Sequence, residues 1–138
     1  NIDNAPTVLD LVGLPVPEEM QGRSLKPILE GNPPKDWRTS MYYHYYEFGG
    51  NHWVAPNYGI RTERYKLISY YTENQWELFD LQNDPDEMES LFKWGGYDIH
   101  PGYETVVHDL VEELKQLRKQ YKDDTGQPVR LVPTKQYD

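Results

Sequence analysis

The chain has 138 residues, no cysteine and a net charge of −9, with 23 acidic against 14 basic side chains. This is the length of one ordinary domain with a single core. An acidic chain whose few Lys and Arg form no stripe argues against binding to nucleic acid or to anionic lipid. No apolar run reaches the ~20 residues of a membrane span. We therefore expect no nucleic-acid partner and no membrane partner.

Two short helices and a proline-rich linker are predicted in the first part of the chain. The first helix covers residues 3–12 and ends at Gly13, and the second is a single turn over residues 25–29. The linker follows at residues 32–34, which read Asn-Pro-Pro. Because the chain starts at Asn1 and not at a methionine, we expect it to be a piece of a longer protein.

Strands are predicted in the middle of the chain. Residues 41–47, MYYHYYE, are dense in aromatic side chains, and alternation places Tyr42, His44 and Tyr46 on the same face. A loop over residues 48–57 follows. The later expectations are a strand over 58–71 paired with a strand over 76–81, a helical turn over 88–92 and a strand over 129–132.

The strongest local pattern predicts a long amphipathic helix over residues 103–121. Its apolar positions recur at spacings of three and four, and charged side chains fill the opposite side. A small antiparallel sheet with this helix packed on it, preceded by short helices, is an α+β fold.

The sequence offers no nucleophile and no metal site. Its serines lack the Gly-x-Ser-x-Gly context, and its four histidines show no i, i+4 pair typical of a zinc-binding helix. Asp123 and Asp124 are adjacent, as hard-cation ligands can be, but at a helix end we interpret them as solvated charge. We expect no catalytic residue and no metal in this chain.

Two interpretations of the stretch around the predicted loop stay open. His44, Glu47 and His52 lie among tyrosines beside Trp53, and polar groups walled by rings suit sugar recognition. Alternatively the rings belong to the core, and the His and Glu side chains satisfy one another at a sheet edge.

A basic strand follows the loop. Arg64 and Lys66 are expected to pair with acidic neighbours such as Glu77 or Asp80, whereas the role of Arg61 stays open.

Four motifs occur in an order that resembles the C-terminal region of sulfatases. They are DNAPTVLDLVGLP at residues 3–15, MQGRSL at 20–25, GIRTERYKLI at 59–68, and ELFDL followed by DPDE within residues 77–87. The chain is most similar to the N-sulfoglucosamine sulfohydrolase-like group of bacterial sulfatases.

This resemblance implies an alkaline-phosphatase-like α/β catalytic domain upstream of the chain. That domain would hold calcium and a formylglycine made from Cys or Ser, so neither cofactor is expected here. Residues 1–36 would be the tail of the catalytic domain and residues 37–138 the C-terminal subdomain, which closes one side of the substrate pocket. Both this domain and the substrate would be partners of the chain, in a periplasmic or extracellular enzyme.

The resemblance also implies a function and candidate substrate-binding residues. The chain would be the C-terminal part of a sulfuric ester hydrolase acting on sulfated carbohydrates such as glycosaminoglycans, inactive alone. The residues that could face substrate are His44, Glu47, His52, Trp53 and Arg61. The alternatives are part of a related phosphonate or phosphodiester hydrolase, a free-standing carbohydrate-binding module and a purely structural subdomain.

Overall fold

The computed structural model describes residues 1–48, 53–93, 96, 98–126 and 129. The chain divides into two compact units, residues 1–38 and residues 39–138. Among the described residues, no helix is both long and apolar enough to cross a bilayer.

The first unit contains the two predicted short helices, α1 (Asn4–Leu11) and α2 (Lys26–Leu29). Thr7 joins them, because its hydroxyl donates to the Asp3 carbonyl at 2.6 Å and accepts from the Leu25 amide at 2.8 Å. The Asp3 carboxylate accepts the Arg23 amide at 2.8 Å and pairs with Arg38. These polar contacts stabilise helices that are too short to be stable alone in water.

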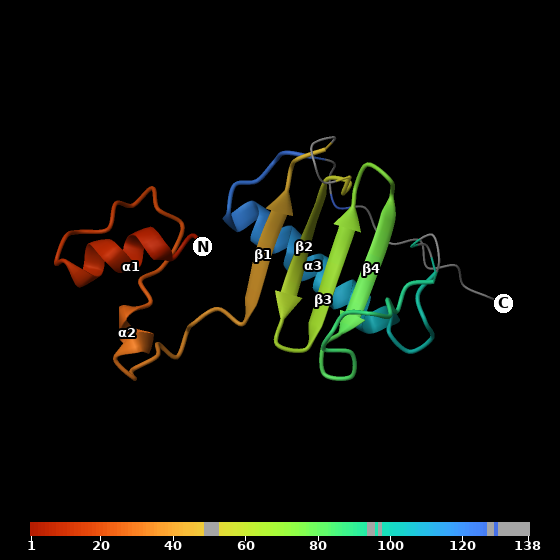
Figure 1. The fold of residues 1–138 in the computed structure, drawn as a ribbon, viewed down its shortest axis with the longest axis horizontal. Helices are drawn as coiled ribbons and strands as arrows, with labels where there is room; N and C mark the ends of the chain where they lie inside the picture. Colours follow the sequence, from red (N-terminus) through yellow and green to blue (C-terminus); the bar gives the residue numbers. More distant parts are fainter. Residues whose placement is uncertain (49–52, 94–95, 97, 127–128, 130–138) are drawn as a thin grey trace. The chain divides into compact units, whose positions relative to one another are not determined.

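The second unit is a four-stranded antiparallel sheet with one long helix across one face (Figure 1). The elements are β1 (Ser40–Tyr45), β2 (Asn57–Thr62), β3 (Tyr65–Tyr70), β4 (Gln75–Asp80) and α3 (Glu104–Gln120). The strands lie side by side in sequence order, each antiparallel to its neighbour. The predicted α+β fold and the long helix are confirmed.

The single strand predicted over residues 58–71 is wrong, because that stretch is the hairpin of β2 and β3. The chain reverses at Glu63 and Arg64, both exposed. The Thr62 hydroxyl supports this turn by accepting the Tyr65 amide at 2.9 Å. The core-facing positions change from even-numbered residues (Tyr58 and Ile60) to odd-numbered ones (Leu67) across the turn, a change of phase that one continuous strand would not show.

The helical turn predicted over residues 88–92 is also wrong. This segment runs along the free edge of β4, where the Leu91 amide donates to the Leu78 carbonyl at 2.7 Å. The Ser90 hydroxyl accepts the amides of Leu78 and Phe92. An edge strand exposes unpaired backbone groups, and this lining satisfies some of them. The strand predicted over residues 129–132 lies outside the described residues except for Val129.

A single hydrophobic cluster lies between the sheet and α3. Its sheet and helix members are Tyr58, Ile60, Leu67, Trp76, Leu78, Val107, Leu110, Val111, Leu114 and Leu117. Each fully buried aliphatic side chain contributes roughly 1.5–3 kcal/mol. Burial of this cluster therefore stabilises the packing of α3 on the sheet.

On the opposite face of the sheet, the Tyr43 ring lies over Gly59, its cross-strand partner. A Cβ added at Gly59 would lie 2.7 Å from the Tyr43 ring and 2.5 Å from the Leu67 carbonyl oxygen. Both approaches are shorter than van der Waals contact, so only glycine fits here.

Gly59→Ala should lower the free energy of unfolding by about 1–3 kcal/mol, because the added methyl group forces Tyr43 and the backbone apart. Urea unfolding at constant slope measures the loss. Lys119→Ala, at an exposed position of α3, is the control and should change the free energy by less than about 0.5 kcal/mol. Equal stability of the two variants would contradict this account.

Candidate functional site

His44 lies at the end of β1 on the face that α3 covers, and its imidazole is engaged on every side. Nδ1 is 2.7 Å from Oδ2 of Asp123, and Nε2 is 3.1 Å from the Tyr71 hydroxyl. The ring stacks on Tyr46 at a centroid distance of 3.7 Å and meets the edge of Tyr58. The side chain is 3% exposed, so in this arrangement His44 cannot contact a substrate.

The Asp123 carboxylate accepts hydrogen bonds from β1, from the residue that follows β1 and from its own turn. Its Oδ2 accepts the Tyr42 hydroxyl at 2.5 Å and the Tyr46 hydroxyl at 3.3 Å, besides the His44 ring nitrogen. Its Oδ1 accepts the amide and the hydroxyl of Thr125 at 3.0 and 2.5 Å. The interpretation of Asp123 as solvated charge is therefore wrong, since its side chain is only 9% exposed.

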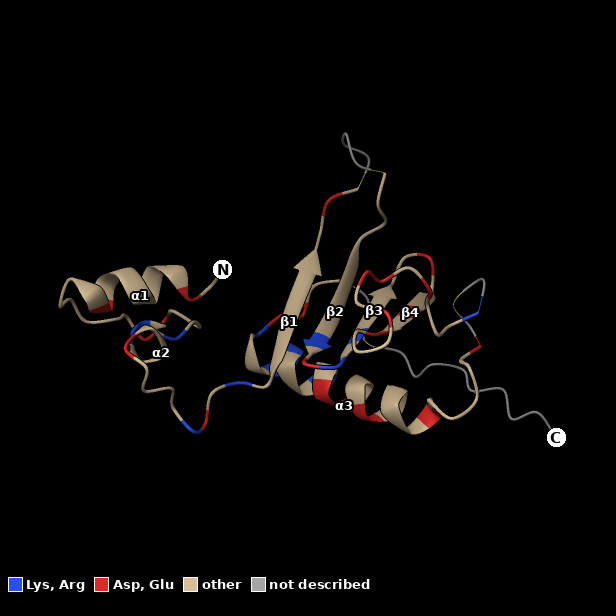
Figure 2. Ribbon diagram, turned by 60° about the horizontal axis from the view of Figure 1, so that its bottom comes forward, with Lys and Arg blue, Asp and Glu red and all other residues tan. Residues whose placement is uncertain are grey.

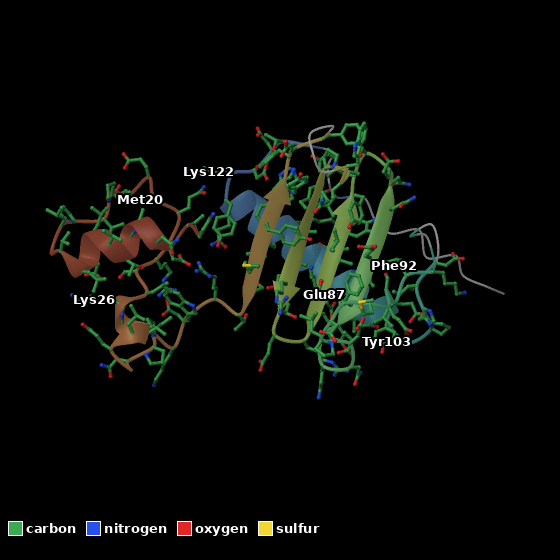
Figure 3. All side chains as sticks on the ribbon, viewed as in Figure 1. Met20, Lys26, Glu87, Phe92, Tyr103 and Lys122 are labelled. Carbon is green, nitrogen blue, oxygen red and sulfur yellow. The ribbon has the colours of Figure 1, made fainter. Side chains whose placement is uncertain are left out.

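The turn after α3 explains how Asp123 reaches the sheet. Lys122, labelled in Figure 3 at the end of this helix, has a φ of 53°, a left-handed conformation uncommon for a residue with a Cβ. The Asp123 amide donates to the Arg118 carbonyl at 2.9 Å, which closes the helix end. The next residues turn back toward β1.

The electrostatics of this cluster favour an ionised carboxylate. Burial would raise the pKa of Asp123, but the hydrogen bonds from Thr125, Tyr42 and His44 outweigh it and hold the pKa well below its usual range. Burial and the hydrogen bond to Asp123 raise the pKa of the Tyr42 phenol far above its usual value. Tyr42 is therefore a fixed neutral donor to a fixed anion.

Residues 46–48 and 53–56, the described flanks of the connection between β1 and β2, are hereafter the β1–β2 flanks. Glu47 is exposed, and Trp53 is 82% exposed. Phe48 is also exposed, at 64%. His52 lies outside the described residues. Of the predicted substrate-facing side chains, Glu47 and Trp53 are thus accessible, whereas His44 supports β1, the strand that leads to Glu47.

Arg61 lies on the other face of the sheet and pairs with Glu87, labelled in Figure 3, at 3.3 Å. Lys66 pairs with the second oxygen of the same carboxylate. The predicted pairing of Arg64 is confirmed, because its guanidinium donates to both oxygens of Asp80 at 3.1 and 2.8 Å. That bidentate contact lowers the pKa of Asp80. These cations stabilise the sheet and do not form an anion site.

Charge elsewhere in the described part of the chain is dispersed, with Lys and Arg interleaved among acidic side chains (Figure 2). Within the same residues, no group of three or more His, Asp or Glu side chains could hold a metal ion. With no cysteine and no serine in a Ser-x-Pro-x-Arg sequence, the chain contains no precursor of a formylglycine. The residues that the structure describes do not fit the cofactors that the resemblance implies.

Solved structures contain a similar sheet and helix as part of larger enzymes, among them sulfatases and a phosphonate monoester hydrolase. An enzyme solved in complex with its substrate D-glucosamine-2-N,6-O-disulfate superposes with a TM-score of 0.78 at 43% identity, over 88% of this chain and 24% of its own. The phosphonate monoester hydrolase of Agrobacterium radiobacter superposes with a TM-score of 0.66 at 26% identity, over 86% of this chain and 24% of its own.

Sequence comparison then gives the family. Residues 1–120 match the family described as "N-sulphoglucosamine sulphohydrolase, C-terminal", and the chain belongs to it. The chain is 44% identical over 127 residues to an N-acetylglucosamine-6-O-sulfatase of Bacteroides thetaiotaomicron, covering 90% of this chain and 22% of that protein. It is 32% identical to a Delta 4,5-hexuronate-2-O-sulfatase of the same organism, covering 89% and 26%. The chain thus spans about a quarter of the length of these relatives.

The ionised Asp123 predicts a dependence of stability on pH. A carboxyl whose pKa is lowered by folding stabilises the fold above its unfolded pKa of about 3.9, and this contribution is lost as the pH falls below that value. Between about pH 5 and pH 2 the free energy of unfolding should therefore decrease less in Asp123→Asn than in the unchanged chain. Urea unfolding at a series of pH values measures the difference, expected to be roughly 1–3 kcal/mol.

Asp109→Asn is the matched control, because Asp109 is an exposed carboxylate on α3. It should leave the pH dependence unchanged. Parallel curves for Asp123→Asn and the unchanged chain would show that Asp123 does not contribute to it.

Proposed function

We propose that the full-length protein is a sulfatase that removes a sulfate ester from an amino sugar, and that this chain is its C-terminal subdomain. The observation that carries the proposal is the 44% identity to an N-acetylglucosamine-6-O-sulfatase along 90% of the chain. The identity to the phosphonate monoester hydrolase is 26% over a similar share. Sequence similarity therefore favours a sulfated sugar over a phosphonate as the substrate.

In this proposal the subdomain supplies one wall of the substrate pocket, and the β1–β2 flanks are the part that meets the sugar. Trp53 offers an apolar ring on which the C–H face of a pyranose can stack, and Glu47 offers an acceptor for a hydroxyl. Trp53 and Phe48 both expose large apolar rings, and an exposed apolar surface is typical of a place that a ligand or another domain covers. Arg61 is a weaker candidate because Glu87 already holds it.

The reaction itself belongs in this proposal to the catalytic domain upstream. Calcium and formylglycine would be bound there, because the described residues of this chain do not fit them. We assign no chemical step to this chain. A bacterial enzyme of this kind, acting on glycosaminoglycan fragments, would work in the periplasm or outside the cell.

The direct test is sulfate release from N-acetylglucosamine-6-sulfate by the full-length protein in the presence of calcium, followed by ion chromatography. The isolated chain is expected to release none. Turnover of a phosphonate monoester without sulfate release would replace the proposal by a phosphonate hydrolase. Binding of a neutral oligosaccharide by the isolated chain would favour a carbohydrate-binding module instead.

Trp53→Ala in the full-length protein should raise KM for the sulfated sugar roughly tenfold, the loss of about 1.4 kcal/mol of binding. The reason is that the stacking surface is removed while the catalytic domain is untouched. Steady-state kinetics measure KM and kcat separately. Met88→Ala is the control, since Met88 is an equally exposed apolar side chain, 78% accessible, beside β4. A KM that does not move in Trp53→Ala would exclude this residue from the sugar site.

A further inference from the structure

We propose that Asp123 is a positioning residue for the sugar-binding side of the enzyme, fixing the β1–β2 flanks relative to the end of α3. The inference rests on the proposed function, because it assigns to the flanks a role in binding sugar. It concerns a residue in the C-terminal turn, 79 positions along the chain from His44.

The first flank leaves β1 directly from the Asp123 cluster. One oxygen of Asp123 accepts from Tyr42 and His44 on β1 and from Tyr46, the first residue of the flank itself, at alternate positions along the chain. These are the last helix-facing side chains before Glu47. Three donors on one acceptor restrain both the position of the end of β1 and its rotation about the strand axis. A single hydrogen bond would leave that rotation free.

The second flank enters β2 beside the same cluster. Tyr58 is fully buried, stacks on Tyr71 at 5.2 Å and lies with its ring 4.3 Å from the Arg118 guanidinium carbon. The Tyr71 hydroxyl in turn contacts His44. Gly126, three residues after Asp123, lies against the Tyr71 ring, where an added Cβ would be 3.1 Å from its nearest atom. The turn after α3 therefore contacts the supports of both flanks.

The cluster lies at the end of the hydrophobic core, and the core does not depend on it. The core side chains of α3, Leu110 and Leu114 among them, lie on the helix well before Asp123. A change at Asp123 should therefore leave the sheet and α3 assembled. What it should alter is the position of the flanks, which extend from β1 and β2 beyond the core.

Asp123→Asn tests the positioning of the flanks separately from the assembly of the core, because Asn has nearly the same shape as Asp. An amide keeps one acceptor oxygen and gains two N–H donors. If its oxygen faces Thr125, the amide nitrogen faces the donors on β1; if the oxygen faces β1, the nitrogen faces the Thr125 amide. In the first orientation the Tyr42 and Tyr46 hydroxyls and the His44 ring nitrogen must change from donors to acceptors, and in the second the Thr125 amide meets another donor. In both, the charge that holds the donors is lost.

The experiment compares two substrates in the full-length protein. One is N-acetylglucosamine-6-sulfate, whose sugar would contact the flanks, and the other is a small aryl sulfate that has no sugar. In Asp123→Asn, kcat/KM for the sugar should fall on the order of 10–100-fold, since a misplacement of about 1 Å costs up to that factor. For the aryl sulfate it should stay within about twofold. Asp109→Asn should leave both values unchanged.

The possible outcomes distinguish a positioning role of Asp123 from a purely structural one. Equal losses for both substrates would make Asp123 a general structural residue, and no loss for either would remove its positioning role; both results overturn the inference. An unchanged protein that hydrolyses neither sulfate would instead overturn the proposed function. If Asp123→Asn does not unfold cooperatively, Tyr42→Phe replaces it, because it removes one donor and keeps the ring and the charge. A smaller loss, again confined to the sugar, is then expected, and no such selectivity would overturn the inference.

Discussion

The packing of α3 against one face of the sheet is the constraint on which the second unit depends. An antiparallel sheet of four short strands has one apolar face to bury, and α3 supplies an apolar stripe of matching length. Because the helix crosses the sheet diagonally (Figure 1), its C-terminal end reaches the edge strand β1. Residues that follow the helix are thereby brought to the strand that leads into the β1–β2 flanks.

At that edge, polar contacts replace apolar ones. The Asp123 side chain is nearly buried, and each hydrogen bond described for its carboxylate comes from a donor group. A buried charge can stabilise a fold only when it is satisfied by hydrogen bonds in this way. The surrounding tyrosines combine ring packing with a hydroxyl that can reach the carboxylate. A chain with few aliphatic residues thus uses aromatic side chains both to extend its core and to satisfy an anion at its rim.

On the face of the sheet away from α3, basic side chains are paired with a carboxylate. Glu87 holds Arg61 and Lys66 together, and Tyr43 lies flat over Gly59. Cations that would attract an anionic sugar if they were free are instead paired within the sheet. The exposed aromatic side chains are concentrated on the β1–β2 flanks, and this separation of paired charge from exposed rings supports placing sugar contacts there.

The long helix, the first strand and the family can be predicted from local patterns in the sequence. Spacings of three and four define α3, the aromatic alternation in β1 sorts its side chains onto two faces, and the four ordered motifs are those of the sulfatase C-terminal region. Such signals are local, so a single sequence carries them. The prediction of one strand over residues 58–71 missed the turn at Glu63 and Arg64, because no Gly, Pro, Asn or Asp stands there to mark it.

Which side chains meet across long stretches of sequence depends on the tertiary structure. His44 was predicted as a substrate contact and Asp123 as solvated charge, yet the two side chains are hydrogen-bonded to each other. Their encounter depends on the crossing angle of α3 and on the left-handed turn at Lys122. Neither is encoded in the residues next to His44, since the direction of a helix is set by packing of the whole core.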